Sequence, residues 1–215
     1  MKLYGYWRSS AAYRVRIGLN LKGLEVEEEF VHLQRLEQRG DGYLALNPQG
    51  LVPTLIHGEV RIGQSLAILE YLDDIHPEPA LLPPDPAGRA RVRQLAQVVA
   101  CDIHPVDNLK VLNFLTNDMG VTDEGRLVWY RHWVTQGLEA FENLVDGQAA
   151  TGQFCHGDQP SLADLCLVPQ LYNARRFEMD LSLYPTLQRI DQACGVLDAF
   201  ARAAPEVQPD APATA

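Results

Sequence analysis

The sequence predicts an α/β fold in the N-terminal part of the chain and an all-α fold in the C-terminal part. Short strand and helix patterns alternate over the first part, whereas almost no strand pattern follows. Five prolines stand between Pro77 and Pro86, a run that cannot be helical and that separates the two parts. With 215 residues, 47% of them hydrophobic, the chain can bury one or two cores. We expect domains at residues 1–80 and 87–215, joined by a linker at 77–86.

The N-terminal part is expected to begin with a strand, a helix and a second strand. Residues 2–6 form a short aromatic strand. Residues 10–22 carry apolar side chains at helical spacing, and Gly23 suits the position just after a helix end. Residues 26–33 form the second strand, although three consecutive glutamates obscure its pattern. These elements make a β-α-β unit.

A hairpin and a helix are expected to complete the N-terminal part, after an irregular helical stretch. The hairpin strands are expected at 54–57 and 59–62, with a tight turn at His57–Gly58. Ser65 is expected to cap a helix that ends before Pro77. A β-α-β unit followed by a β-β-α unit, with a valine–proline pair before the third strand, has the order of the thioredoxin fold.

The C-terminal part is expected to be all-helical. Pro105 interrupts its longest helix, because proline removes a backbone donor. Ser161 begins another helix with Asp164 three positions later, a sequence typical of a capped helix start. The expected helices cover residues 87–118, 123–145, 161–175, 185–194 and 196–203. The chain from Pro205 on is expected to be irregular.

Charge and hydropathy exclude several classes of partner. The chain has 28 acidic and 18 basic residues, so its net charge is −10 with histidine neutral. Nucleic acids and anionic membranes bind clustered lysine and arginine, and we therefore expect neither as a partner. No segment has the pattern of a signal peptide or of a membrane-spanning helix. We expect a cytoplasmic protein.

The cysteine pattern argues against metal binding and against thiol redox chemistry. The four cysteines, at positions 101, 155, 166 and 194, show neither Cys-x-x-Cys spacing nor the histidine pairing of zinc sites. We expect no metal. Redox proteins of the thioredoxin fold carry Cys-x-x-Cys at the start of the first helix, where this chain has Ser9-Ser10-Ala11-Ala12. A reactive thiol must therefore come from another molecule, or redox chemistry is not the function.

Six motifs in order resemble the zeta class of glutathione transferases, which includes the maleylacetoacetate isomerases; the bacterial maleylpyruvate isomerases are similar too. The motifs are WRSSAAYRVRIGLNLKG (7–23), NPQGLVPTL (47–55), QSLAILEYL (64–72), ACDIHPVDNLKVL (100–112), LADLCLVPQ (162–170) and ARRFEMDLSLYPTL (174–187). The family often has serine-serine-cysteine-serine where this chain has serine-serine-alanine-alanine. The resemblance implies glutathione-transferase architecture, glutathione as cofactor and a homodimer.

The resemblance also implies that the first helix binds the thiolate of glutathione at its N-terminus. Ser9 and Ser10 are the catalytic candidates. The hydroxyl of Ser9 is expected to donate to the thiolate, while Ser10 and Ala11 contribute mainly backbone N–H groups. Capping alone would also explain two serines at a helix start.

Other glutathione contacts are implied around the third strand and the helix after it. Gln64 and Ser65 match positions that hold the γ-glutamyl carboxylate, although a capped helix would explain the same pair. Val52 is expected to pair its backbone with the cysteinyl unit, which requires a cis Val52–Pro53 bond. Two further positions that approach glutathione in relatives are glutamines here, Gln38 and Gln49.

In the C-terminal part, His104, Asn108 and Lys110 match family positions that contact glutathione or substrate, although they could form a solvated helix face. Arg176 matches a position implicated in substrate binding, and its guanidinium suits a carboxylate. A double arginine is otherwise ordinary surface charge. Arg8, beside the serines, is the second candidate for substrate binding.

The activity implied by the resemblance is glutathione-dependent cis–trans isomerisation of maleylacetoacetate to fumarylacetoacetate, in tyrosine and phenylalanine catabolism. Maleylpyruvate, from gentisate degradation, is a second candidate substrate because both compounds are maleyl diacids of similar shape. Two further functions remain open: a glutathione transferase acting on small electrophiles such as α-halo acids, and a glutathione-binding module without enzymatic activity. A thiol oxidoreductase is disfavoured by the missing cysteine.

Overall fold

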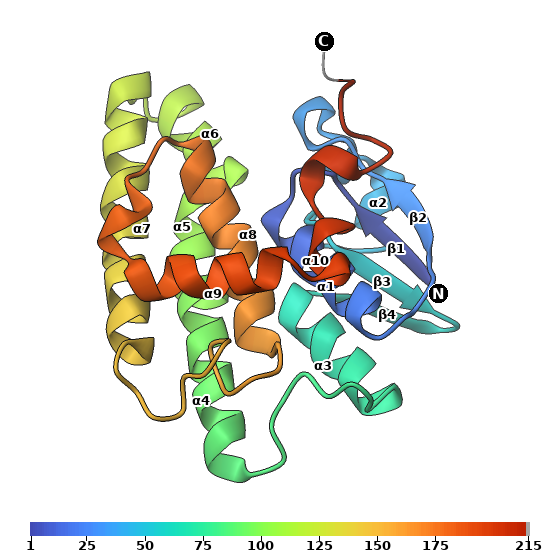
Figure 1. Ribbon diagram of the computed structural model, residues 1–215. Coiled ribbons are helices and arrows are strands. Elements are labelled where there is room, and N and C mark those ends of the chain that lie inside the picture. The colour runs from blue at the N-terminus through green and yellow to red at the C-terminus, as the bar shows by residue number, and fades with distance from the viewer. Residues whose placement is uncertain (214–215) are drawn as a thin grey trace. The chain divides into compact units, whose positions relative to one another are not determined.

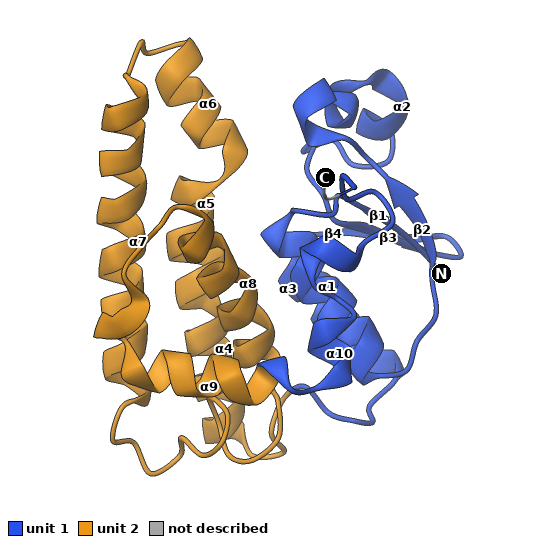
Figure 2. Ribbon diagram, turned by 45° about the horizontal axis from the view of Figure 1, so that its top comes forward, with its two compact units in different colours: residues 1–81, 195–215 blue, residues 82–194 orange. Residues whose placement is uncertain are grey.

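The structure is a computed structural model that describes residues 1–213. It contains two compact units (Figure 2). The first unit combines Met1–Leu81 with the chain from Gly195 on, and the second covers Leu82–Cys194. The described residues from Gly195 on, 195–213, therefore group with the N-terminal residues.

The first unit is built on a four-stranded mixed sheet (Figure 1). Its strands are β1 (Lys2–Gly5), β2 (Glu27–Phe30), β3 (Thr54–His57) and β4 (Val60–Gly63), in the order β2-β1-β3-β4. β1 and β2 are parallel, a pairing that needs a crossover connection such as the helix between them, and β3 runs antiparallel to β1 and β4. The expected β-α-β and β-β-α order is confirmed. All of β2 is exposed at the sheet edge, which explains why it tolerates three glutamates.

Two helices supply much of the apolar core of this unit. Val15 and Ile17 of α1 (Ser10–Leu21) are fully buried, as are Leu69 and Leu72 of α3 (Ser65–Ile75). The two helices pack against each other, and α3 also contacts β3 and β4. Between β2 and β3 the chain forms three short helical turns, which confirm the expected irregular stretch: η1 (Leu33–Arg35), η2 (Glu37–Arg39) and α2 (Asp41–Leu44).

The start of α3 differs from the expectation that Ser65 caps it. Gln64 is the N-cap residue and has a positive φ of 67°, a conformation that is uncommon outside glycine. Ser65 is the first helical residue, and its Oγ accepts a hydrogen bond from Arg14 Nη1 at 3.2 Å. A buried arginine donates to the hydroxyl that was expected to cap the helix, and the two residues lie 51 positions apart in the sequence.

Polar side chains of α1 hold the C-terminal segment on the first unit. Asn20 Nδ2 donates to Ala199 O at 3.0 Å, and Arg16 Nε donates to Ala203 O at 3.1 Å. Over residues 196–213 the regular elements are the short helix α10 (Asp198–Ala201) and the turn η5 (Pro205–Val207), so the helix expected at 196–203 is shorter than predicted. Carbonyls near α10 bind side chains of α1, a role that local periodicity does not indicate.

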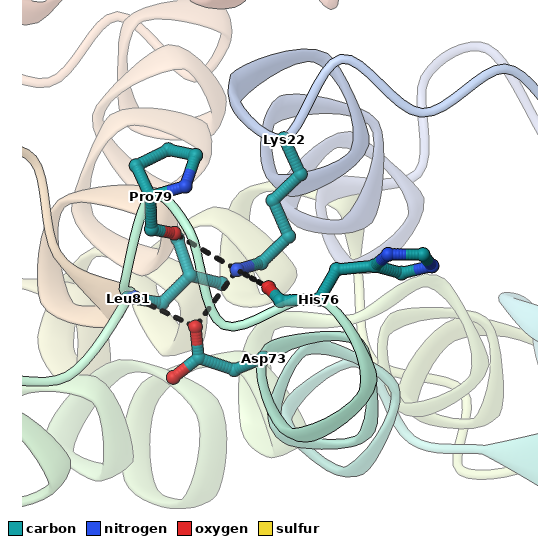
Figure 3. Close-up of polar contacts among 5 residues, drawn as sticks. All are labelled: Lys22, Asp73, His76, Pro79 and Leu81. Carbon is teal, nitrogen blue, oxygen red and sulfur yellow. Dashed lines mark hydrogen bonds and ion pairs between the residues drawn. The ribbon is translucent and has the colours of Figure 1, made fainter.

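Lys22 anchors the start of the proline-rich segment to the first unit (Figure 3). Its side chain is fully buried, and its Nζ donates to Asp73 Oδ1 at 2.8 Å and to the carbonyls of His76 and Pro79 at 2.7 and 2.9 Å. The same Asp73 oxygen accepts from Leu81 N at 2.8 Å. One ammonium and one carboxylate therefore fix the path of the chain beyond α3.

Replacing Lys22 with methionine keeps the apolar stem and removes the ammonium. Because Asp73 and two carbonyls would lose their donor, we expect the free energy of unfolding to fall by about 1–2 kcal/mol, together with faster hydrogen exchange at Leu81 N. The control is Lys2→Met: Lys2 pairs with Glu27 and Glu29 on an exposed strand, and its loss should change stability by no more than ~0.5 kcal/mol. Equal effects of the two substitutions in chemical denaturation would contradict this role of Lys22.

The second unit is helical throughout its regular elements. These are α4 (Pro86–Gln97), η3 (Val98–Ile103), α5 (His104–Asp107), α6 (Leu109–Asn117), α7 (Asp123–Val145), α8 (Leu162–Arg176), η4 (Leu181–Leu183) and α9 (Pro185–Gly195). The helices expected at 123–145, 161–175 and 185–194 are confirmed to within about a turn. No helix in the described part of the chain is long and apolar enough to cross a membrane.

The break in the long first helix of this unit differs from the expected one at Pro105. Pro105 lies in α5, which continues directly from η3, and the backbone around it stays helical. The helix instead widens to a π-helix at η3 and breaks at Asn108, whose ψ of 160° is extended. Asn108 Oδ1 then accepts from Lys110 N and Val111 N and so caps α6.

The expected cap at Ser161 is confirmed and is fully buried. Asp164 Oδ2 accepts from the backbone N and the Oγ of Ser161, each at 2.8 Å. Its Oδ1 accepts from Cys155 N, also at 2.8 Å. Burial raises the pKa of Asp164, while these donors favour its ionised form. Asp164 therefore joins the loop before α8 to the helix start and acts in folding.

Candidate functional site

Ser9 stands at the N-terminus of α1 and is its N-cap residue. Its backbone is extended, with φ −70° and ψ 117°, and its Oγ accepts from Ala12 N at 3.2 Å. A hydroxyl that accepts one bond can still donate its own hydrogen, so capping and anion binding are compatible. No acidic side chain lies in the first turn of α1. The positive end of this helix is therefore not neutralised from within the turn, which favours a bound anion.

The N-terminus of α3 brings a second group of expected residues together. Gln64 Nε2 donates to Gln49 Oε1 at 2.9 Å, so two predicted glutathione contacts touch each other. Ser65 beside them is 5% exposed, and no acidic residue lies in the first turn of α3. The positive φ of Gln64 is a strained conformation of the kind that gathers at ligand sites. The N-terminus of α3 therefore suits a bound carboxylate, just as the N-terminus of α1 suits a bound thiolate, because the first N–H groups of a helix can bind an anion.

Arg14 was missed by the sequence analysis. It is 2% exposed, and its Nη1 hydrogen bond to Ser65 Oγ joins the N-terminus of α3 to the middle of α1. The signal was present in the sequence, because Arg14 lies one residue after Tyr13 and one before Val15, on a helix that has apolar residues on most sides. An arginine in such a stretch indicates a buried polar partner.

The loop before β3 contains the cis Val52–Pro53 bond, which confirms the prediction for this peptide. The pairing of β3 begins at Thr54, opposite Tyr4 and Gly63, so Val52 lies outside the ladder. The carbonyl of Leu51, just before it, accepts from Tyr43 Oη at 2.7 Å and from Asn47 Nδ2 at 2.8 Å. Two buried polar side chains therefore hold the loop, and sequence patterns had not identified either.

Gln38 is half-buried in the turn η2. Its Nε2 donates weakly to Leu33 O at 3.4 Å. Its Oε1 is buried, and no hydrogen-bond partner for it exists within residues 1–213. A buried acceptor of this kind is costly unless a ligand or water satisfies it. Because this oxygen has almost no exposed surface, the structure does not place it in contact with a ligand, and the role of Gln38 stays a prediction.

The candidates of the second unit lie at the junction of α5 and α6 and at the end of α8. His104 is the first residue of α5, Asn108 caps α6, and Lys110 is exposed in its first turn. The Asn108 side chain is engaged in capping, and its Nδ2 also donates to Pro105 O at 2.9 Å. The structure accounts for Asn108 as a structural residue and leaves the Lys110 ammonium exposed.

The two arginines that end α8 have different surroundings. Arg175 forms an ion pair with Asp191. Arg176 is exposed, and its guanidinium carbon lies 5.8 Å from the centre of the Phe177 ring. That ring stacks on Tyr130 with centroids 3.8 Å apart. An aromatic pair thus supports Arg176.

Two further observations concern cations and thiols. The guanidinium of Arg8 lies 5.2 Å from the centre of the Trp7 ring, so the side chain packs on its neighbour just before Ser9.

Burial raises the pKa of the Cys155 and Cys194 thiols, which therefore remain protonated near neutral pH. Within residues 1–213, no group of three or more histidine, cysteine or acidic side chains is arranged to hold a metal ion.

A thioredoxin-like sheet with a serine at the start of its first helix, followed in the chain by a helical unit, is the fold of the glutathione transferases. The family model "Glutathione S-transferase, N-terminal domain" matches residues 1–74. The probable maleylacetoacetate isomerase of Vibrio cholerae is 53% identical, over 97% of both chains.

Two solved structures are similar along the whole chain. A holo maleylpyruvate isomerase, described as a bacterial zeta-class glutathione transferase, has a TM-score of 0.96 and 48% identity, over 99% of this chain and 100% of the other. The maleylacetoacetate isomerase of Methylobacterium extorquens AM1, with bound malonate and glutathione, has a TM-score of 0.96 and 47% identity over the same shares. The chain belongs to the zeta class of glutathione transferases, the family of the maleylacetoacetate and maleylpyruvate isomerases.

Proposed function

We propose that this protein is a glutathione-dependent cis–trans isomerase of maleyl diacids, converting maleylacetoacetate to fumarylacetoacetate in tyrosine and phenylalanine catabolism. The proposal rests on the composition of the N-terminus of α1. A serine and the first N–H groups of the helix lie there. The first turn contains neither an acidic residue nor a cysteine. Such a site suits an external thiolate. Relatives near 50% identity are named as isomerases of this type.

The residues of the first unit fit glutathione as the cofactor. When bound, glutathione would supply a thiolate nucleophile: its addition would make the double bond single and so free to rotate, and its expulsion would restore the double bond as the trans isomer and regenerate glutathione. The Ser9 hydroxyl and the N–H groups of Ser10 and Ala11 stabilise that anion. Ser65 and the start of α3 hold the γ-glutamyl carboxylate, and the Val52 backbone pairs with the cysteinyl unit. The remaining proposed contacts are Gln38, Gln49, Pro53 and Gln64, with His104, Asn108 and Lys110 from the second unit.

The first candidate for substrate binding, Arg176, lies in the second unit. Arg176 offers a planar fork that can bind one carboxylate with two parallel hydrogen bonds. Arg8, in the first unit, is the second candidate for substrate binding. On this proposal residues 1–80 form the glutathione-binding domain and the helical region forms the substrate-binding domain.

Two rival activities use the same thiolate site. Maleylpyruvate differs from maleylacetoacetate only beyond the maleyl group, and an α-halo acid could take the place of either diacid. The test compares initial rates on maleylacetoacetate, maleylpyruvate and a chloro acid at saturating glutathione. We expect the diacids to react faster than the halo acid, and the faster diacid identifies the substrate. Release of chloride without isomerisation of either diacid would favour a general transferase.

We also propose a homodimer in the cytoplasm. Throughout the glutathione transferase superfamily the N-terminal half of one subunit packs against the helical half of its partner. Light scattering at micromolar concentration should therefore give twice the 24.0 kDa of one chain. A mass of one chain under these conditions would refute the dimer.

A further inference from the structure

The C-terminal segment contacts the loop that leads into Ser9. Asp210 Oδ2 accepts from Trp7 N at 2.9 Å, a contact between residues 203 positions apart. Trp7 is two residues before Ser9 and directly before Arg8. The segment expected to be irregular therefore holds the backbone at the entrance to the proposed thiolate site.

Arg16 holds the other side of the same loop. It is 6% exposed, and its Nη2 donates to Trp7 O at 2.9 Å. Its Nη1 lies 3.5 Å from Tyr6 O, at the long limit of a hydrogen bond, and its Nε donates to Ala203 O. Tyr6 O also accepts from Ser9 N at 2.9 Å. One arginine thus joins the C-terminal segment, the loop and a carbonyl bonded to Ser9.

Internal contacts place Asp210 for this role. Phe200 is 1% exposed and fixes the segment in the core. Gln208 Nε2 donates to Arg202 O at 3.0 Å and to Ala204 O at 2.8 Å. Ala211 N donates to Gln208 O at 3.0 Å, which closes a turn around Asp210. The carboxylate is therefore presented by a folded turn.

We propose that Arg16 and Asp210, here called the C-terminal clamp, are positioning residues for the Ser9 hydroxyl. The clamp binds both the N–H and the carbonyl of Trp7, and so fixes the direction in which the chain enters α1. A displacement of that entry would move the Ser9 hydroxyl relative to an anion at the helix start, and hydrogen bonds to an anion depend strongly on geometry. This proposal rests on the proposed role of Ser9 in stabilising the glutathione thiolate.

The test uses the full chain with Asp210→Ala, Asp210→Asn and, as a control, a chain that lacks residues 213–215. We expect Asp210→Ala to raise the thiol pKa of bound glutathione and to lower kcat by about 3- to 10-fold, with glutathione affinity changed less than about twofold. Asparagine keeps an acceptor oxygen and should restore most of the loss. The control truncation keeps Asp210 and should behave as the intact chain.

Hydrogen exchange at Trp7 N separates failure of the clamp from failure of the proposed function, because it requires no catalysis. Faster exchange in Asp210→Ala, with an unchanged thiol pKa and kcat, would overturn the positioning role. Unchanged exchange would show that Asp210 does not hold the loop. Ser9→Ala is measured in parallel. If it too leaves the thiol pKa unchanged, the proposed role of Ser9 and the positioning role both fail, while the exchange result still decides whether the clamp exists.

Discussion

Replacing Ser9 with alanine is expected to lower kcat/KM for the diacid by ~10- to 150-fold, because one hydrogen bond to an anion contributes about 1.5–3 kcal/mol. The thiol pKa of bound glutathione should rise, since the thiolate loses a donor while the thiol loses little. The thiolate fraction then falls at a fixed pH below the new pKa, and the deficit should shrink as pH rises. Thiolate absorbance against pH, measured with the complex, checks both statements.

Two variants control for the second function of Ser9, the cap at Ala12 N. Threonine retains both the cap and the hydroxyl donor, so Ser9→Thr should keep most of the activity. Ser10 is 6% exposed and is proposed to act mainly through its backbone. Ser10→Ala should therefore lower kcat/KM less than Ser9→Ala does. If Ser10→Ala loses activity while Ser9→Ala keeps it, the assignment within the pair is wrong.

Arg176→Ala is expected to raise KM or lower kcat/KM for the diacid by ~10- to 150-fold through loss of a charge-assisted, bidentate contact. The substrate is a dianion and the protein carries a net charge of −10, so long-range attraction is poor and local cations must compensate. Glutathione affinity should remain nearly unchanged, because its γ-glutamyl carboxylate is assigned to Ser65 and the start of α3. Kinetics and glutathione titration on one preparation give both constants.

Arg175→Ala is the matched control, because its ion pair with Asp191 already occupies the guanidinium. It should leave KM for the diacid almost unchanged. Arg176→Lys keeps a positive charge but loses the planar fork, so its kcat/KM for the diacid should lie between those of Arg176→Ala and the native protein. An Arg176→Ala protein that loses glutathione affinity, but shows normal diacid kinetics at saturating glutathione, would move Arg176 from the substrate site to the cofactor site.

The elements of the fold could be predicted where the pattern is local. The alternation of strand and helix signals gave the β-α-β and β-β-α order, and the apolar spacing gave α7. The errors have long-range causes. Ser65 looks like a cap in sequence, but its hydroxyl meets Arg14, 51 residues away. The helix expected at 196–203 covers only Asp198–Ala201, and carbonyls of this segment accept hydrogen bonds from Arg16 and Asn20 of α1.

The candidate site was predictable to a similar extent. The serine at the start of α1 follows from helix capping and the resemblance to a known motif, and the cis Val52–Pro53 bond was expected on the same basis. The supporting side chains were not predicted. Arg14, Tyr43 and Asn47 act through hydrogen bonds to loops and hydroxyls that only the folded chain brings near. Sequence patterns indicate candidate site residues more readily than the residues whose hydrogen bonds hold the surrounding loops in place.

We expect glutathione to act as a cofactor that is regenerated in a cis–trans isomerisation. The most direct measurement follows isomerisation of maleylacetoacetate with and without glutathione, and titrates free glutathione after many turnovers. We expect fumarylacetoacetate to form rapidly only with glutathione, with the glutathione titre unchanged. Consumption of glutathione in proportion to product would contradict the account, as would isomerisation at an equal rate in its absence.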